Sequence, residues 1–299
     1  MTVIPLKNTQ TAWVVSIFSI IRGSSGRSPD RATDGHGQET GHSYSPPLFE
    51  KIPWVVIPTY NEAGNLPAMA SAIMALPVPR LHLLFVDDDS PDGTGELAEE
   101  QVRLFPERIA VLHRREQRGL GRAYLAGFRA VLERGATAVV QMDCDFSHQP
   151  ADVPRLLAAL ADADLAIGSR YVPGGNVDSH WGVNRKLLSA WANFYARSIL
   201  GLRSVRDVTA GFRAWRRQTL QGLGLERILS QGYVFQVEMT YVAWRLGYKI
   251  TELPIFFPDR QVGESKMTIP VKFEAAVRVW DVRHRHRHLT PADREEDRE

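Results

Sequence analysis

Two acidic residues separated by one position, Asp143 and Asp145, are spaced to hold a divalent cation. They follow the apolar run 138–142, and alternate residues of an extended chain point to the same side, so both carboxylates can face one ligand. A cation between them removes the repulsion of two like charges. Because the sequence offers hard oxygen ligands and no cluster of Cys and His, it favours Mg²⁺ or Mn²⁺ over zinc. Mg²⁺ bound in this way usually also binds substrate phosphates, which implies a nucleoside diphosphate substrate.

Polar segments also follow three other short apolar runs. In α/β proteins the carboxyl ends of parallel strands meet at one edge of the sheet, and ligands bind there. We therefore expect these segments and residues 143–145 to form one site, in which Asp87, at the tip of its strand, contacts the base or ribose of a nucleotide. The three segments are residues 58–62, 87–93 and 168–170.

The apolar runs alternate with helix-like stretches from Ile52 onward. Runs that are apolar throughout are typical of strands covered on both faces. Their alternation with helices predicts an α/β fold, with a mostly parallel sheet flanked by helices. The expected strands are residues 54–57, 81–86, 109–112, 138–142 and 165–167, and the expected helices are residues 65–76, 93–104, 120–134 and 151–161.

Composition divides the chain into three parts. Residues 1–50 are expected to form a flexible extension, because most of them are small or polar and offer little to bury. Residues 51–282 are predicted to form one catalytic domain, and residues 283–299 a charged tail that begins with alternating Arg and His. The apolar run 12–21 is too short to cross a membrane, which takes about 20 residues. The single cysteine, Cys144, excludes an internal disulfide.

The charge of the whole chain is close to neutral, with 36 basic and 34 acidic residues and a formal net charge of +2. A nucleic-acid binder is usually basic across its whole domain, so nucleic acid is not an expected partner. Between residues 170 and 217, however, nine basic residues accompany only two acidic ones, a local net charge of +7. Two apolar stripes at helical spacing either contact a lipid surface, as basic amphipathic helices do, or face the core. They are Leu187, Leu188, Trp191, Tyr195 and Ile199, and Ile269, Phe273, Ala276, Val277 and Trp280.

Seven motif-like segments follow one another along the chain, namely VVIPTYNE, VDDDSPDGT, GLGRAYLAGF, MDCDFSH, IGSRYVPGG, D-x-T-A-G-F-R and RQVGESKM. Together they resemble the family 2 glycosyltransferases of GT-A fold, and more closely their polyprenol (dolichol) monophosphate mannose synthase branch. The resemblance covers about residues 52–282, and DDDSPDGT, GSRY-x-x-GG and GESKM are its most specific parts.

This resemblance implies an inverting transfer of mannose from GDP-mannose to a polyprenyl phosphate. It also implies a peripheral enzyme on the cytoplasmic face of the membrane, held there by surface helices or by a separate membrane-anchoring subunit. C-terminal amphipathic helices would then contact the lipid surface. The acceptor phosphate is largely a dianion at neutral pH, so it can attack without a strong general base.

The resemblance also assigns roles to residues at the matching motif positions. Asp145, Arg170 and Arg185 would be catalytic, and Arg170, Arg185 and Ser189 would bind the acceptor phosphate. Asp143 and Asp145 would bind the metal. Ser147 stands where some relatives carry Gln, and because serine is a weaker metal ligand it would act through water. The nucleotide sugar would contact Pro58, Tyr60, Glu62, Asp87, Asp89, Gly119, Asp143, Cys144, Asp145, Arg260 and Lys266.

Other interpretations remain open at this stage. A related enzyme could transfer glucose or another sugar from a UDP-sugar donor. A Mg²⁺-binding receiver domain also has acidic residues at strand ends, but its acidic pair should follow the first strand, where this chain has PTYNE. His148, close to the acidic pair in the sequence, could bind the metal or contact the acceptor, and the sequence leaves both roles open.

Overall fold

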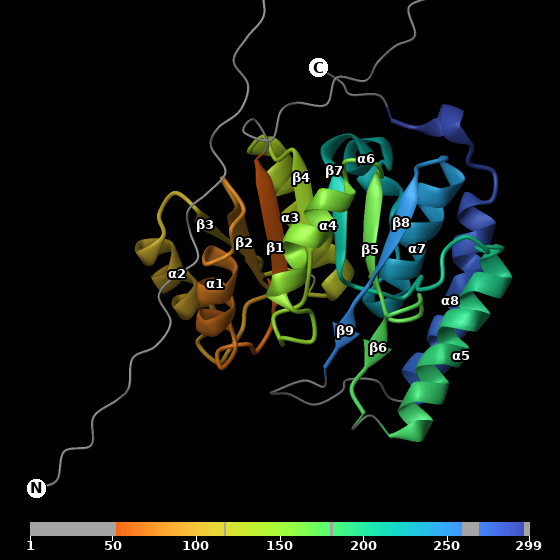
Figure 1. Cartoon of the computed structure of the whole chain (residues 1–299), viewed down its shortest axis with the longest axis horizontal. Coiled ribbons are helices and arrows are strands. Elements are labelled where there is room, and N and C mark those ends of the chain that lie inside the picture. The colour runs from red at the N-terminus through yellow and green to blue at the C-terminus, as the bar shows by residue number, and fades with distance from the viewer. Residues whose placement is uncertain (1–51, 117, 180–181, 259–268, 296–299) are drawn as a thin grey trace, which may run out of the picture. The chain divides into compact units, whose positions relative to one another are not determined.

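A seven-stranded sheet forms the centre of the structure, in the order β3-β2-β1-β4-β7-β5-β8 (Figure 1). The computed structural model describes residues 52–116, 118–179, 182–258 and 269–295, and for residues 269–275 the backbone alone. Strand β7 runs antiparallel to β4 and β5, whereas the other pairings in this sheet are parallel. The mostly parallel α/β sheet predicted from the sequence is therefore confirmed. The expected extension 1–50 lies outside the described residues.

The five predicted strands and four predicted helices are all present, and further elements follow them. The strands are β1 (Pro53–Thr59), β2 (His82–Asp87), β3 (Ile109–His113), β4 (Ala138–Gln141), β5 (Leu165–Ser169), β7 (Arg213–Arg216) and β8 (Ile250–Pro254), and β6 (Asn176–Val177) pairs with β9 (Phe256–Phe257) in a small second sheet. The helices are α1 (Leu66–Met74), α2 (Thr94–Leu104), α3 (Leu120–Glu133), α4 (Val153–Ala159), α5 (Val183–Leu200), α6 (Arg217–Gly222), α7 (Gly232–Arg245) and α8 (Ile269–His286), with single-turn helices at Pro150–Asp152, Leu225–Arg227 and Pro291–Asp293.

Strand β1 shows why the sheet needs helices on both faces. Val55 and Ile57 belong to a buried cluster with α1, α2 and α4, whereas Trp54 and Val56 belong to a second cluster with α3, α6, α7 and α8. This alternation follows from the two-residue period of a strand. Helix α3 packs closely on β1 and β2, because a Cβ atom at Gly127 would lie 2.5 Å from Cγ1 of Val56. Glycine at this position lets the start of α3 lie near the carboxyl edge of the sheet.

The first residues of the predicted charged tail, 283–286, form the last turn of α8. Helix α8 continues to His286, which is buried, and His286 Nε2 lies 2.8 Å from Oε1 of the buried Glu238 on α7. Arg285 lies 3.1 Å from the same oxygen. Burial would raise the pKa of Glu238, but the hydrogen bonds from His286 and the Ser230 backbone outweigh burial and lower it. The alternating Arg and His residues thus supply partners for a buried carboxylate.

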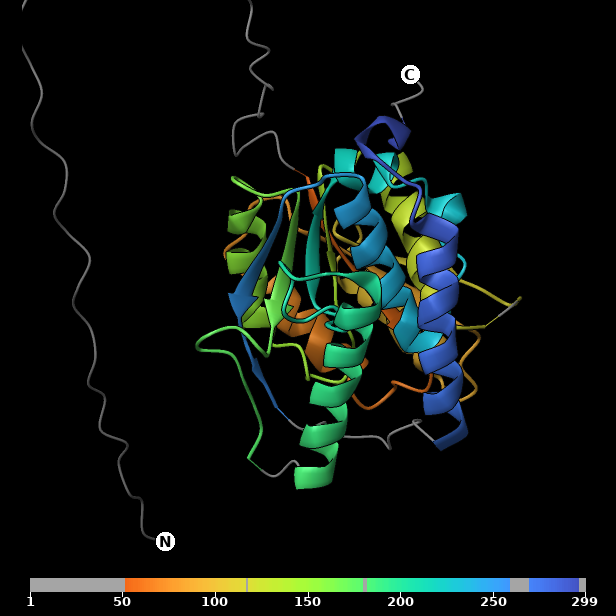
Figure 2. The same ribbon diagram turned by 90° about the vertical axis from the view of Figure 1, so that its right-hand side faces the viewer.

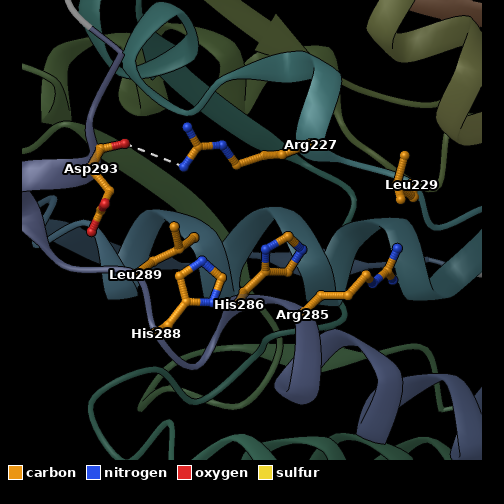
Figure 3. Close-up of a pocket in the computed structure, with 7 residues that line it drawn as sticks. All are labelled: Arg227, Leu229, Arg285, His286, His288, Leu289 and Asp293. Atoms are coloured by element: carbon orange, nitrogen blue, oxygen red, sulfur yellow. Dashed lines mark hydrogen bonds between the residues drawn. The ribbon is translucent and has the colours of Figure 1, made fainter.

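A pocket of about 430 Å³ lies against the C-terminal end of α8 (Figure 3). Arg227 on one side of this pocket donates to the backbone carbonyl of Asp293 at 3.3 Å. Its lining comes from the C-terminal part of the chain and includes no residue of the strand-end segments, so this pocket does not belong to the predicted site. The lining residues are Arg227, Leu229, Arg285, His286, His288, Leu289 and Asp293.

Helices α5 and α8 lie side by side (Figures 1 and 2). The hydroxyl of Tyr195 joins them, since it donates to the carbonyl of Ala276 at 3.2 Å and accepts from Trp280 Nε1 at 3.1 Å. Tyr195 and Ile199, which the sequence placed in one apolar stripe, pack against the core instead. The stripe is therefore only partly exposed.

A different set of apolar side chains is exposed on these two helices, and we call it the α5–α8 face. Each member exposes half or more of its surface, and the spacing of those on α5 places them on one side of the helix. None of the described helices is long and apolar enough to span a membrane. The α5–α8 face consists of Val183, Leu187, Trp191, Phe194, Val277 and Trp280.

Candidate active site

The carboxyl ends of the neighbouring strands β1, β2 and β4 carry three of the four predicted segments, residues 58–62, 87–93 and 143–145, whereas the fourth, 168–170, lies at the end of β5. Strand β1 has β2 on one side and β4 on the other, so the strand order reverses beside β1, where α/β sheets bind ligands. Each of the three loops contains a non-glycine residue with positive φ, namely Asn61 at 60°, Asp89 at 58° and Phe146 at 57°. Asn and Asp adopt this conformation readily, whereas a phenylalanine does so only when its surroundings fix the backbone. The loop after β4 is therefore tightly held.

Asp143 is fixed at two points. The hydroxyl of Tyr124 donates to Oδ1 of Asp143 at 3.0 Å, and the backbone N–H of Asp143 donates to Nδ1 of His148 at 2.9 Å. Burial raises the pKa of Tyr124 well above its usual value, and nearby Asp143 adds to the effect, so the phenol remains a proton donor. His148 is itself buried and stacks on Phe212 with ring centroids 5.0 Å apart. A hydrogen bond thus joins the buried ring of His148 to the backbone of Asp143.

Asp145 accepts two hydrogen bonds from Ser147. Both the backbone N–H and the hydroxyl of Ser147 donate to Oδ1 of Asp145, at 3.0 and 2.6 Å. Ser147 is buried, so in this arrangement it orients Asp145, and its predicted role as a ligand through water stays a prediction. Burial raises the pKa of the Cys144 thiol well above its usual value, which keeps it protonated between the two carboxylates.

The donor set fits a hard cation. Within the described parts of the chain no group of three or more His, Cys, Asp or Glu side chains is placed to hold a metal. Two carboxylates from Asp143 and Asp145 therefore leave most of a coordination shell to other oxygens. Mg²⁺ sites of this kind are completed by water and substrate phosphates. The arrangement suits a cation that arrives with a diphosphate better than a permanent structural metal.

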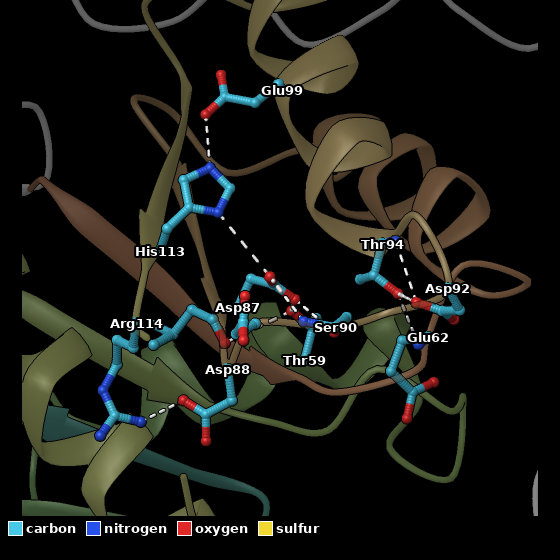
Figure 4. Close-up of polar contacts among 12 residues, drawn as sticks. Thr59, Glu62, Asp87, Asp88, Ser90, Asp92, Thr94, Glu99, His113 and Arg114 are labelled. Carbon is cyan, nitrogen blue, oxygen red and sulfur yellow. Dashed lines mark hydrogen bonds and ion pairs between the residues drawn. The ribbon is translucent and has the colours of Figure 1, made fainter. Parts of the chain in front are cut away.

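Three consecutive aspartates, residues 87–89, lie where β2 ends and its loop begins, and Figure 4 shows the first two of them, Asp87 and Asp88. Asp87 is buried and accepts hydrogen bonds from the hydroxyls of Thr59 at 3.3 Å and Ser90 at 2.6 Å. Asp88 forms an ion pair with Arg114 and accepts from the backbone N–H of Gly119 at 2.8 Å. Gly119 precedes α3 with a φ of 144°, a conformation that favours glycine. Asp88, which sequence reasoning did not select, thus fixes the backbone of Gly119, a predicted contact of the nucleotide sugar.

Asp92, in the same loop, joins the first two strand ends. Its carboxylate accepts from the backbone N–H groups of Thr94 and Ala63, each at 3.1 Å. The hydroxyl of Thr94 in turn accepts from the backbone N–H of Glu62 at 2.9 Å. The segment 58–62 is therefore held against the start of α2, as Figure 4 shows for Glu62, Asp92 and Thr94.

Arg118 brings two predicted nucleotide contacts together. It lies 2.9 Å from Oδ2 of Asp89 and donates to the hydroxyl of Tyr60 at 3.2 Å. Its guanidinium also stacks on the Tyr60 ring, 5.1 Å from the ring centroid. Arg118 was not among the predicted site residues, although it directly precedes the glycine-rich motif that begins at Gly119.

The predicted acceptor residues occupy two different environments. Arg170 forms a bidentate pair with Asp207, with Nε–Oδ2 and Nη2–Oδ1 both 2.8 Å, and Asp207 is wholly buried. Burial would raise the pKa of Asp207, but the charge and hydrogen bonds of Arg170 lower it. Ser189 on α5 shares a hydrogen bond of 2.7 Å with the hydroxyl of Tyr171, which joins α5 to this loop. Arg185 lies one turn before Ser189 and is exposed.

Part of the local positive charge predicted for residues 170–217 is buried or already paired within the protein. Arg213 is wholly buried and donates to the backbone carbonyls of three residues, and burial lowers its pKa to about 9. Arg216 and Arg217 likewise donate to backbone carbonyls. The +7 window therefore overstates the charge available to an anionic headgroup. Arg260 and Lys266, predicted to close over the diphosphate, lie outside the described residues.

Comparisons with known proteins identify the family of this chain. Residues 54–224 match the model of the family described as glycosyl transferase family 2. The chain is similar to the polyprenol monophosphomannose synthase of Mycolicibacterium smegmatis, with 47% identity over 77% of this chain and 87% of the relative. It is also similar to the undecaprenyl-phosphate mannosyltransferase of Micrococcus luteus, with 49% identity over 75% and 90% of the two chains.

The fold is shared with a solved structure of low identity. A crystal structure of glucosyl-3-phosphoglycerate synthase from Mycobacterium tuberculosis, in complex with Mn²⁺, UDP and glucosyl-3-phosphoglycerate, is similar with a TM-score of 0.56 and 18% identity. The likeness covers 82% of this chain and 86% of that chain. Together with the relatives, it confirms the resemblance stated from the sequence motifs. The chain is a glycosyltransferase and belongs to glycosyl transferase family 2.

Proposed function

We propose that the protein transfers mannose from GDP-mannose to a polyprenyl monophosphate, with inversion at the anomeric carbon. The observation that carries this proposal is the pair Asp143 and Asp145 directly after β4, the neighbour of β1 in the sheet, in a chain 47–49% identical to relatives named for polyprenyl-phosphate mannose transfer. The lipid acceptor and the mannose rest on those names, and the nucleoside diphosphate on the acidic pair and the motifs.

The site fits a reaction that needs charge neutralisation more than proton transfer. A phosphate monoester with a second pKa near 6 is largely a dianion at pH 7, so it attacks the anomeric carbon without a strong general base. When bound at Asp143 and Asp145, Mg²⁺ or Mn²⁺ would neutralise charge on the leaving diphosphate. Tyr60, Asp87 and Asp89 are proposed to contact the nucleotide, together with Pro58, Glu62, Gly119, Cys144, Arg260 and Lys266.

For the acceptor phosphate we assign the leading contact to Arg185. Its side chain is exposed on α5, one turn from Ser189, and the guanidinium of Arg170 pairs with the buried carboxylate of Asp207. Arg170 is then proposed to act indirectly: its pair with Asp207 fixes the loop after β5. The hydrogen bond between Tyr171 and Ser189 joins that loop to α5. A planar guanidinium binds phosphate through two parallel hydrogen bonds, which suits Arg185 to this role.

Replacing Arg185 by alanine is expected to raise the KM for polyprenyl phosphate on the order of tenfold, because a hydrogen bond to a charged group contributes about 1.5–3 kcal/mol. The KM for the sugar nucleotide should stay within about twofold of wild type. Steady-state kinetics with each substrate varied in turn measure both values, and Arg103→Ala, on the exposed surface of α2, is the matched control. A change confined to the sugar nucleotide would overturn the assignment.

We also propose that the α5–α8 face contacts the membrane surface and keeps the enzyme peripheral to it. Helix α5 begins near the end of the molecule where β6 and β9 lie, and these two strands follow the carboxyl ends of β5 and β8 (lower part of Figures 1 and 2). The exposed apolar side chains at its start are therefore on the side of the molecule to which the acceptor phosphate must come. A separate anchoring subunit is the alternative occupant of this face.

The double variant Trp191→Ser, Phe194→Ser is expected to bind anionic phospholipid vesicles on the order of a hundredfold more weakly. Each buried side chain of this size contributes about 1.5–3 kcal/mol, and about 1.4 kcal/mol corresponds to tenfold. Vesicle sedimentation at several lipid concentrations measures the change. Leu104→Ser serves as control, because Leu104 is equally exposed but lies on α2. Unchanged vesicle binding would favour a protein partner for the α5–α8 face.

A further inference from the structure

The side chain of Tyr124 is placed unusually for a core residue, because it carries a hydroxyl to the edge of the active site. It lies in the first turns of α3, wholly buried, and stacks between Phe128 and Phe235 with ring centroids 5.7 and 5.8 Å away. A phenylalanine would fill this aromatic surround equally well. A buried hydroxyl costs stability unless it has a hydrogen-bond partner. Its partner here is Oδ1 of Asp143, at 3.0 Å.

This contact determines how Asp143 can present its two oxygens. A carboxylate without a fixed partner rotates about its last side-chain bond, and each rotation exchanges the oxygen that faces a cation. A donor on Oδ1 stops this rotation and leaves Oδ2 to face the ligand. The backbone of Asp143 is fixed as well, since its N–H donates to the buried His148. Asp143 is therefore held at its amide and at its carboxylate by two buried side chains.

The position of Tyr124 on α3 adds a second consequence. Gly119, directly before the same helix, is held by Asp88 through a hydrogen bond of 2.8 Å. Helix α3 thus joins Gly119, a predicted contact of the nucleotide sugar, to the carboxylate predicted to bind the cation. The close approach of Gly127 to Val56 fixes this helix against the sheet. A rigid helix is suited to keep both features in one geometry.

We propose that Tyr124 is a positioning residue, whose hydroxyl holds the Asp143 carboxylate in the orientation that binds the divalent cation. This inference rests on the proposed function, since it concerns the metal site of that reaction. Partners that orient metal-binding side chains typically change metal affinity about 10- to 100-fold when they are removed. The proposal therefore concerns the affinity for the cation, and not the stability of the fold.

The test compares Tyr124→Phe with Tyr241→Phe, which makes the same change at a buried tyrosine on α7 away from the acidic pair. Mn²⁺ affinity is measured by electron paramagnetic resonance titration in the presence of GDP, and folding by thermal unfolding. We expect Tyr124→Phe to bind Mn²⁺ about 10- to 100-fold more weakly with a similar Tm. We expect Tyr241→Phe to bind Mn²⁺ like the wild type. The rate of Tyr124→Phe should also recover towards wild type at saturating Mn²⁺.

Asp143→Asn separates this inference from the proposed function. If Asp143→Asn loses Mn²⁺ binding while Tyr124→Phe retains wild-type affinity, the role of Tyr124 is overturned and the metal site stands. If the wild type itself does not bind Mn²⁺ with GDP, the metal assignment and this inference fall together. Should Tyr124→Phe fail to fold, Tyr124→Met is the second variant, because a flexible methionine can fill the aromatic surround without a donor.

Discussion

Replacing Asp145 by asparagine is expected to lower the rate of sugar transfer on the order of 10²–10³-fold, which is typical for the loss of one electrostatic contact to a developing charge. The amide oxygen can still accept both hydrogen bonds from Ser147, so the loop should keep its conformation. What is lost is the negative charge that, with Asp143, makes this edge of the sheet attractive to a divalent cation.

The rate is measured as lipid-dependent release of GDP at saturating GDP-mannose, over a range of Mg²⁺ and Mn²⁺ concentrations. Asp162→Asn is the matched control, because Asp162 is an exposed aspartate beyond the end of α4. An Asp145→Asn enzyme that retains near wild-type turnover would remove Asp145 from the metal site, whatever the fate of the remaining assignments.

Replacing Asp207 by asparagine is expected to lower the free energy of unfolding by about 3–5 kcal/mol, the cost of removing one partner from a buried ion pair. The variant leaves the guanidinium of Arg170, whose side chain is only 10% exposed, without its opposing charge. Because the pKa of Asp207 is lowered in the folded state, its contribution to stability is present above the ordinary pKa of 3.8 and is lost as the pH falls through the folded-state value.

Urea unfolding at several pH values measures this effect. The difference between wild type and Asp207→Asn should be constant near pH 7 and should narrow below about pH 4, as the pH falls from the ordinary pKa of an aspartate towards the lowered folded-state pKa of Asp207. Asp89→Asn breaks the exposed pair with Arg118 and is expected to cost less than about 1 kcal/mol. A loss of similar size in both variants would contradict the special role of the buried pair.

The strands that position the site could be predicted because they are apolar throughout. Strand β7 could not, since its sequence begins and ends with arginine, a pattern that suggests exposure. Arg213 is buried there only because carbonyl groups of residues 208, 210 and 236 converge on it. The burial of His286 in the last turn of α8 could not be predicted for the same reason, because its partner is Glu238, 48 residues earlier. In both cases the chain supplies partners that no local pattern reveals.

Within the site, spacing predicted which loops meet but not how their side chains pair. Asp143 and Asp145 could be selected from their position after a strand. The role of Tyr124 could not, because an aromatic residue in a glycine-rich helix start is usually part of the core. Arg118 bridges loops that follow two different strands, and its reach depends on the three-dimensional positions of Tyr60 and Asp89. Such pairings are set by the folded backbone.

The most direct test of the proposed reaction is a transfer assay with the purified full-length chain, a polyprenyl phosphate, Mg²⁺ or Mn²⁺, and either labelled GDP-mannose or labelled UDP-glucose. We expect label in the lipid fraction with GDP-mannose, its loss when EDTA removes the metal, and its return when the metal is restored. Faster transfer of glucose from UDP-glucose would contradict the proposed donor, and GDP-mannose turnover that does not depend on the lipid would contradict the proposed acceptor.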